Sequence, residues 1–180
     1  MVLLGLMGVL LGWAYSAPPL ALMSRGVGEL AVAVAWGLMV VGADYVQRGQ
    51  FFLIPSVAAV SYALLIANIL IANGFPDAPS DGQVGRRTLA VRLGPRAGAW
   101  VYVALAVLAH LWIAAMVWAL VLPLPTLWAL ASAPLALAAG ALLLRYGHQP
   151  ARLRPAWVLG IAAAVVHGMG LALGFWLVGR

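Results

Sequence analysis

The residues best suited to chemistry lie in one polar stretch between two apolar runs. Asn73, Asp77 and Asp81 follow one another at intervals of four residues. On a helix that spacing brings three oxygen ligands onto one face. Oxygen ligands without a cysteine partner suit Mg²⁺, which takes one or two carboxylates and completes its shell with water and substrate phosphates. The stretch therefore predicts a magnesium site that holds a phosphorylated substrate.

Two arginines, Arg86 and Arg87, follow the acids closely. A guanidinium group can bind phosphate oxygens through two parallel hydrogen bonds. Carboxylates, a divalent cation and arginine together describe a diphosphate site. The spacing alone leaves an alternative open: an ordinary loop in which the acids give solubility and the arginines set the topology.

Two prolines, Pro76 and Pro79, lie among these ligands. Proline inside a helix removes a hydrogen bond and clashes with the preceding turn. We therefore expect a helix that ends near Asn73, then a bend, and then a turn around Asp81. The three oxygen ligands can converge at the membrane edge with or without that bend.

The composition of the whole chain specifies the environment in which this stretch lies. Of the 180 residues, 66% are hydrophobic and 8% are charged, which is too little polar surface for a soluble domain. The length allows about six membrane spans of roughly 20 residues each. The sequence thus predicts an all-α integral membrane bundle, with residues 1–180 as one transmembrane domain. Because cysteine is absent, disulfides and thiolate metal sites are excluded.

Six apolar stretches are the candidate spans, and tryptophan and tyrosine lie near several of their ends, as in an interfacial aromatic belt. The first is short and is stopped by Pro18 and Pro19. The stretches cover approximately residues 1–15, 28–47, 51–72, 97–122, 126–146 and 156–179.

The arginines divide unequally between the two sets of loops. Alternate loops hold eight of them, while the other loops and the C-terminus hold only Arg48 and Arg180. The positive-inside rule places the Arg-rich side, with loop 73–96, in the cytoplasm of a multi-pass protein of the cell (inner) membrane. Topology and anionic head groups explain the net charge of +6 better than nucleic acid does. The eight arginines are Arg25, Arg86, Arg87, Arg92, Arg96, Arg145, Arg152 and Arg154.

Several polar residues lie within or beside the spans. Glu29 and Asn68 are candidates to face a cavity, because polar groups in a membrane are often functional. The alternatives are a residue at the start of a helix for Glu29 and a helix–helix hydrogen bond for Asn68. His110 and His167 lack metal-ligand spacing, and we expect them to be hydrogen-bonded packing residues.

The full string around the acids, N-x-F-P-D-x-x-x-D-x-x-x-G-R-R-T-L-A-V-R-L-G from residue 73 to residue 94, resembles the second aspartate-rich motif of the UbiA family of membrane prenyltransferases. It is most similar to the branch of dihydroxynaphthoate polyprenyltransferases of menaquinone synthesis. Shorter matches occur in order at Tyr15–Pro19, Gly26–Glu29 and Asp44–Gln47, so the resemblance covers nearly the whole chain.

The chain departs from the family pattern in one respect. Members have nine transmembrane helices and two aspartate-rich loops, whereas this sequence has about six helices and only the second loop. It therefore matches the C-terminal two thirds of the family fold. We expect the N-terminal helices and the first aspartate motif to be missing, through truncation or a misassigned start, and a partner chain to supply that half if the protein is active.

The resemblance implies that a polyprenyl group passes from an allylic diphosphate to an aromatic acceptor, with Mg²⁺ bridging the diphosphate to both aspartate loops. Asn73, Asp77 and Asp81 match metal-binding positions, Asp77 and Asp81 being catalytic, and Arg86 and Arg87 match the basic pair that contacts diphosphate. Arg92 and Arg96 are expected to serve topology and head-group contacts.

Two rival interpretations were weighed. A CDP-alcohol phosphatidyltransferase needs D-G-x-x-A-R with later acids, and no acid follows Asp81. A non-catalytic remnant, or half of a split prenyltransferase, stays open because half of the expected metal site is absent. The acceptor also stays open between naphthoate, benzoate, haem and chlorophyll precursors.

Overall fold

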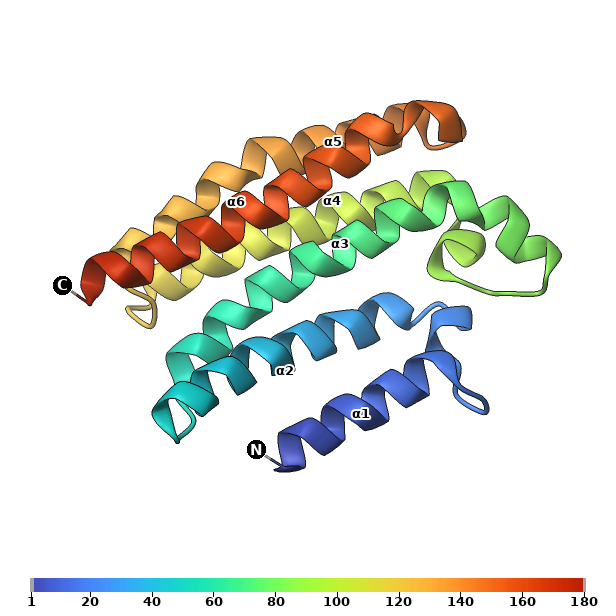
Figure 1. Ribbon diagram of the computed structural model, residues 1–180. Helices are drawn as coiled ribbons and strands as arrows, with labels where there is room; N and C mark the ends of the chain where they lie inside the picture. The colour runs from blue at the N-terminus through green and yellow to red at the C-terminus, as the bar shows by residue number, and fades with distance from the viewer. Residues whose placement is uncertain (1, 180) are drawn as a thin grey trace.

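The structure, a computed structural model, describes residues 2–179, and every regular element in that range is a helix (Figure 1). This confirms the predicted all-α bundle. The α-helices are α1 (Val2–Ser16), α2 (Gly28–Arg48), α3 (Leu53–Gln83), α4 (Leu89–Trp118), α5 (Ala133–Tyr146) and α6 (Arg154–Val178). Short 3₁₀ helices connect them: η1 (Leu22–Ser24), η2 (Leu124–Ser132) and η3 (Pro150–Arg152).

Five helical segments in the described range are long and apolar enough to cross a membrane: α2, α3, α4, the combined segment Leu124–Tyr146, and α6. The predicted first span is present as α1, which at 15 residues is shorter than the others. The estimate of about six spans is thus met by five spans and one short apolar helix.

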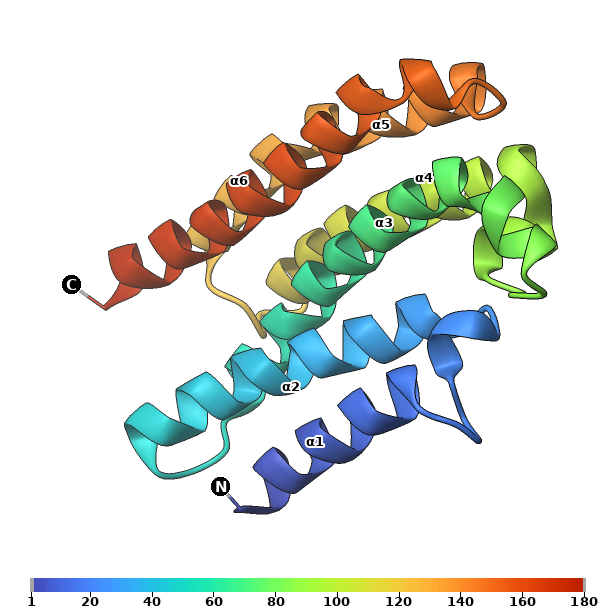
Figure 2. The same ribbon diagram turned by 45° about the vertical axis from the view of Figure 1, so that its right-hand side comes forward.

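Helices α3, α4, α5 and α6 pack together, α2 lies along α3, and α1 lies along α2 (Figures 1 and 2). Because the helices alternate in direction, the segments 17–27, 84–88 and 147–153 gather at one end of the bundle, on the right in Figure 1. These segments adjoin the eight arginines grouped from the sequence, so we call this the Arg-rich end. The segments 49–52 and 119–123 lie at the opposite end.

A chain of hydrogen bonds joins four buried polar side chains inside the bundle. His110 Nδ1 donates to the Ala106 carbonyl at 2.6 Å, and its Nε2 lies 2.7 Å from Ser132 Oγ. His167 Nδ1 lies 3.2 Å from Ser132 Oγ, and its Nε2 lies 3.0 Å from Ser61 Oγ. This chain joins α3, α4 and α6 to the junction of η2 and α5, and it confirms that both histidines are packing residues.

Backbone-to-backbone contact between η2 and α6 requires glycine. A Cβ atom at Gly170 would lie 2.5 Å from the Ala129 nitrogen, and one at Gly174 would lie 2.6 Å from the Thr126 Cα. Close approach of backbones through small residues is a common way to pack helices where lipid supplies no hydrophobic drive.

Substitution of Gly170 by alanine is therefore expected to lower the free energy of unfolding by about 1–3 kcal/mol, because the added methyl group must displace backbone atoms. The matched control is Gly37→Ala in α2, where a Cβ meets no atom within 4 Å. Alanine is also the better helix former there. Thermal unfolding in detergent measures both variants, and equal midpoints for the two would contradict the expectation.

The predicted end of the third helix near Asn73 is wrong, because α3 continues through Pro76 and Pro79 to Gln83. Pro76 has no N–H to offer the carbonyl of Ala72, four residues earlier. The indole Nε1 of Trp157, on α6, donates to that carbonyl at 3.1 Å. A donor from a helix 85 residues away thus replaces the missing helical hydrogen bond.

Candidate functional site

The last turns of α3 carry the three predicted metal ligands. Since the helix is unbroken, Asn73, Asp77 and Asp81 lie on one face, each rotated by about 40° from the one before. Asn73 and Asp77 are exposed, and the side chain of Asp81 is 14% exposed. We call these three residues the carboxylate ladder, and it lies at the Arg-rich end of the bundle.

Arg86 lies directly against the ladder. Its Nη1 atom is 3.3 Å from Asp81 Oδ1, and its backbone N–H donates to the Asp81 carbonyl at 2.9 Å. The turn between them passes through Gly85, whose φ of 75° is in the left-handed region that glycine adopts without strain. The Arg86 side chain is 46% exposed, so this ion pair adds little stability. The guanidinium is therefore positioned to exchange a carboxylate oxygen for a phosphate oxygen.

Arg87 fixes the loop through its backbone. Its N–H donates to the Ser24 carbonyl at 2.9 Å, and its own carbonyl accepts from Arg92 Nε at 2.9 Å. These bonds hold the loop after α3 against the loop before α2. The Arg87 side chain is exposed and makes no hydrogen bond or ion pair with residues 2–179. Its guanidinium is thus free for an external anion, whereas Arg92 serves the loop.

The two candidate cavity residues have different surroundings. Glu29 lies in the first turn of α2, partly exposed, at the same end as the ladder. Asn68 is buried, and its Nδ2 donates to the Tyr102 carbonyl of α4 at 3.0 Å. It lies about 140° around α3 from Asn73 and faces the core. Asn68 therefore makes the helix–helix hydrogen bond that the sequence left as the alternative, while its Oδ1 has no partner within residues 2–179.

The donor atoms of the ladder suit a magnesium ion. Two carboxylates and one amide, all hard oxygen donors on a partly exposed face, fit an ion that keeps several waters and binds substrate phosphates. Within the part of the chain that the structure describes, no group of three or more Asp, Glu, His or Cys side chains could enclose a metal. The residues thus fit Mg²⁺ as one side of a shared site.

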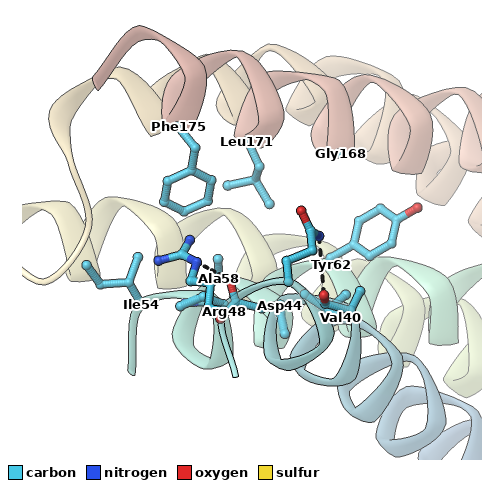
Figure 3. A pocket seen from close by; sticks show the side chains of 13 residues that line it. Val40, Asp44, Arg48, Ile54, Ala58, Tyr62, Gly168, Leu171 and Phe175 are labelled. Carbon is cyan, nitrogen blue, oxygen red and sulfur yellow. Dashed lines mark hydrogen bonds and ion pairs between the residues drawn. The ribbon is translucent and has the colours of Figure 1, made fainter. Parts of the chain in front are cut away.

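A cavity of about 560 Å³ lies between α2, α3 and α6, toward the opposite end of the bundle (Figure 3). Its walls are mainly apolar and include Tyr62, Leu171 and Phe175. Near its outer edge, Arg48 Nε lies 2.8 Å from Asp44 Oδ1. The sequence does not predict this cavity, because three separate helices line it. A local sequence pattern carries no information on the distances between those helices.

The cavity and the ladder share one face of α3. By helical periodicity Tyr62, Ile66, Leu70, Asn73 and Asp77 fall within about 80° of one another around the helix. At about 1.5 Å per residue, Tyr62 lies roughly 22 Å along the axis from Asp77. Ile66 and Leu70, between them, are partly exposed. This face therefore has cation-binding oxygen atoms at one end, an apolar strip in the middle and a cavity at the other end.

Comparison with known proteins shows the family of this chain. The sequence model of the UbiA prenyltransferase family matches residues 1–161. The 1,4-dihydroxy-2-naphthoate octaprenyltransferase of Mycobacterium tuberculosis is 33% identical over 171 residues, which cover 87% of this chain and 56% of that protein. The enzyme of the same name from Mycobacterium leprae is 37% identical, over 71% of this chain and 42% of that protein.

A third relative is the 2-carboxy-1,4-naphthoquinone phytyltransferase of Synechocystis, 30% identical over 93% of this chain and 55% of that protein. This chain thus spans about half the length of the curated relatives it matches. No solved structure gave a significant match. The family match over most of the chain, and the ladder on the motif that carries the likeness, establish that this chain belongs to the UbiA prenyltransferase family.

Proposed function

We propose that this chain forms one side of a site that transfers a polyprenyl group from an allylic diphosphate to an aromatic acceptor, in quinone biosynthesis of the menaquinone type. The observation that carries the proposal is the single face of α3, which joins the carboxylate ladder to an apolar strip and a cavity. A polyprenyl diphosphate has the same order of parts, with a charged head and a long apolar tail. The naphthoate and naphthoquinone acceptors in the relatives' names support a bicyclic aromatic acceptor.

In this proposal the diphosphate lies at the Arg-rich end. Asn73, Asp77 and Asp81 hold Mg²⁺, which when bound neutralises charge on the leaving diphosphate. Arg86 leaves Asp81 to bind a phosphate oxygen, and Arg87 contributes its free guanidinium. Both arginines thereby orient the diphosphate so that the allylic C–O bond points toward the acceptor ring.

The apolar strip of α3 has a separate task. Ile66 and Leu70 lie beside the first isoprene units and keep water away from the carbon that loses the diphosphate. The electron-rich ring then attacks that carbon, and a C–C bond replaces the C–O bond, whose electron pair leaves with the diphosphate. The ring regains aromaticity by losing a proton, or carbon dioxide from a carboxylated acceptor, at the attacked ring carbon. Exclusion of water matters here because water is the competing nucleophile.

The far end of the tail occupies the cavity in this proposal, which gives a direct test. At Gly168 a Cβ atom would lie 3.1 Å from the Tyr62 ring, so Gly168→Leu adds atoms to the cavity wall. With Mg²⁺ present, we expect this variant to bind long allylic diphosphates about tenfold more weakly while binding short ones as wild type does.

The matched control is Gly42→Leu, on the side of α2 that faces away from the cavity, where a Cβ meets no atom within 4 Å. Competition binding with a series of chain lengths, on the purified chain in detergent, measures both variants. A loss of affinity that is equal for short and long tails would remove the cavity from the proposal.

The membrane setting follows the same reasoning. The five spans make the chain a multi-pass membrane protein. We propose that it lies in the cell membrane with its Arg-rich end, and hence the ladder, on the cytoplasmic side.

A second candidate, half of a split enzyme that needs a partner chain, is favoured by one observation. The ladder occupies one face of one helix, and within residues 2–179 no three Asp, Glu, His or Cys side chains come together around a metal position. Ligands for the other side of the diphosphate then come from another polypeptide segment. Without such a segment the chain is a non-catalytic relative of the family.

A further inference from the structure

A second pocket, of about 380 Å³, lies between the start of α4 and the end of α5 at the Arg-rich end. Its polar lining is Arg96 and His148, and its apolar lining includes Trp100 and Leu144. Trp100 is 57% exposed, as expected for a tryptophan at the level of the lipid head groups. The pocket thus has a cationic rim and an apolar wall that continues toward the bilayer.

The backbone shapes this pocket by a break in α4. Gly94 has φ 73° and ψ 170°, so the helix restarts at Pro95 and presents a new N-terminus beside Arg96. Gly147 closes the floor, because a Cβ atom there would lie 3.2 Å from the Pro95 Cβ and 3.0 Å from the Phe75 ring. Phe75 faces the core of the bundle, so this pocket and the carboxylate ladder lie on different sides of α3.

The charges around the pocket have no acidic partner on α4, α5 or α6. No Asp or Glu follows Asp81 in the sequence, so α4, α5 and α6 carry arginines alone. Arg96 makes no ion pair or hydrogen bond within residues 2–179. Arg145 and Arg152 lie 5.3 and 5.5 Å from the centre of the Tyr146 ring, next to Gly147. A guanidinium at a membrane edge without a carboxylate partner favours an anion from outside.

We propose that this pocket binds the phosphate of an anionic glycerophospholipid. The Arg96 guanidinium holds the phosphate oxygens, the restarted N-terminus of α4 adds its positive end, and one acyl chain lies along Trp100 and Leu144. The lipid covers the seam between α4 and α5 and supplies the negative charge that this half of the protein lacks. The inference concerns a site separate from the ladder and does not depend on the proposed transfer reaction.

The first test is native mass spectrometry of the full chain, titrated with phosphatidylglycerol or phosphatidylcholine. We expect one tightly held phosphatidylglycerol, bound about tenfold more weakly by Arg96→Gln, because a charged hydrogen-bond donor is lost. The matched control is Arg154→Gln, which removes the same charge at the same end from an exposed residue outside the pocket. It should bind as wild type does.

Three results would overturn the proposal: equal losses in the two variants, equal retention of phosphatidylcholine, or displacement of the lipid by inorganic phosphate. The last would assign the pocket to free phosphate. A second measurement uses no charge variant, so it remains informative if Arg96→Gln does not fold. The emission of Trp100 is obtained as the difference between the spectra of wild type and Trp100→Phe. Phosphatidylglycerol with brominated chains should quench this emission at lower mole fractions than brominated phosphatidylcholine does. Equal quenching by both lipids would also count against the site.

Discussion

Asp77→Ala and Asp81→Ala are each expected to lower prenyl transfer by at least about a hundredfold, which corresponds to roughly 3 kcal/mol of transition-state stabilisation. Each change removes a carboxylate from a ladder that offers only two. Negative charge builds up on the diphosphate as the C–O bond breaks, so the loss falls on the transition state more than on substrate binding. We therefore expect a large fall in kcat with a smaller change in KM.

The matched control is Gln83→Ala, at the end of the same helix. Gln83 is exposed, and the helical period places it about 160° around α3 from Asp81 and about 120° from Asp77. All variants should insert and unfold as wild type does, because Asp77 makes no side-chain hydrogen bond and Asp81 makes only the exposed pair with Arg86. Radiolabelled product gives the rates, in membranes that contain this chain together with the part of the Mycobacterium tuberculosis relative that it does not match. Near-normal turnover by Asp81→Ala would remove the ladder from the mechanism.

The fold was largely predictable because lipid restricts the possibilities. A chain with so few charged residues must satisfy its backbone internally, and helices do so within each segment. The alternation of arginines then indicated which loops share an end of the bundle, and the structure confirms that grouping. The packing role of His110 and His167 was also predicted, since their sequence spacing gave no metal pattern.

The errors have a common physical cause, which is contact between residues far apart in the sequence. Pro76 is a local signal for the end of a helix, but Trp157 satisfies the carbonyl that the proline leaves free. For Asn68 the sequence left a cavity-facing role and a helix–helix hydrogen bond open, and the hydrogen bond depends on Tyr102, 34 residues away. The cavity of α2, α3 and α6 needs the positions of three helices at once.

The sequence predicted which residues form the ladder, but it did not predict their arrangement in space. The spacing of four residues identified the three members, and the family motif implied that they bind metal. The helix continues to Gln83, so the three residues share one face of α3 with the apolar strip that starts at Tyr62, while Figure 1 shows the last turns of α3 bent away from its main axis. That shared face, which persists across the bend, is the feature on which the proposed binding of a long-chain substrate rests.

The position of the ladder on one face of one helix also leads to the second large effect. A diphosphate with its metal carries several charges at the edge of a low-dielectric region, and it needs ligands on more than one side. Within the described range the ladder supplies one side only. In addition, only 6% of the most apolar window of α2 is buried, against 33–44% for the other spans, so much of its surface is free to contact another helix.

We therefore expect residues 1–180 alone to yield no prenylated product above background. Co-expression with the part of the Mycobacterium tuberculosis relative that this chain does not match should raise product by at least about a hundredfold, because the family pattern leads us to expect the first aspartate-rich loop in that part. The assay supplies a polyprenyl diphosphate, Mg²⁺ and dihydroxynaphthoate to membranes. Two controls isolate the effect: the added segment alone, and the added segment with Asp77→Ala of this chain, both of which should be inactive. Robust product from the chain alone would mean that the ladder needs no second side, and that the ligands around the diphosphate have been misassigned.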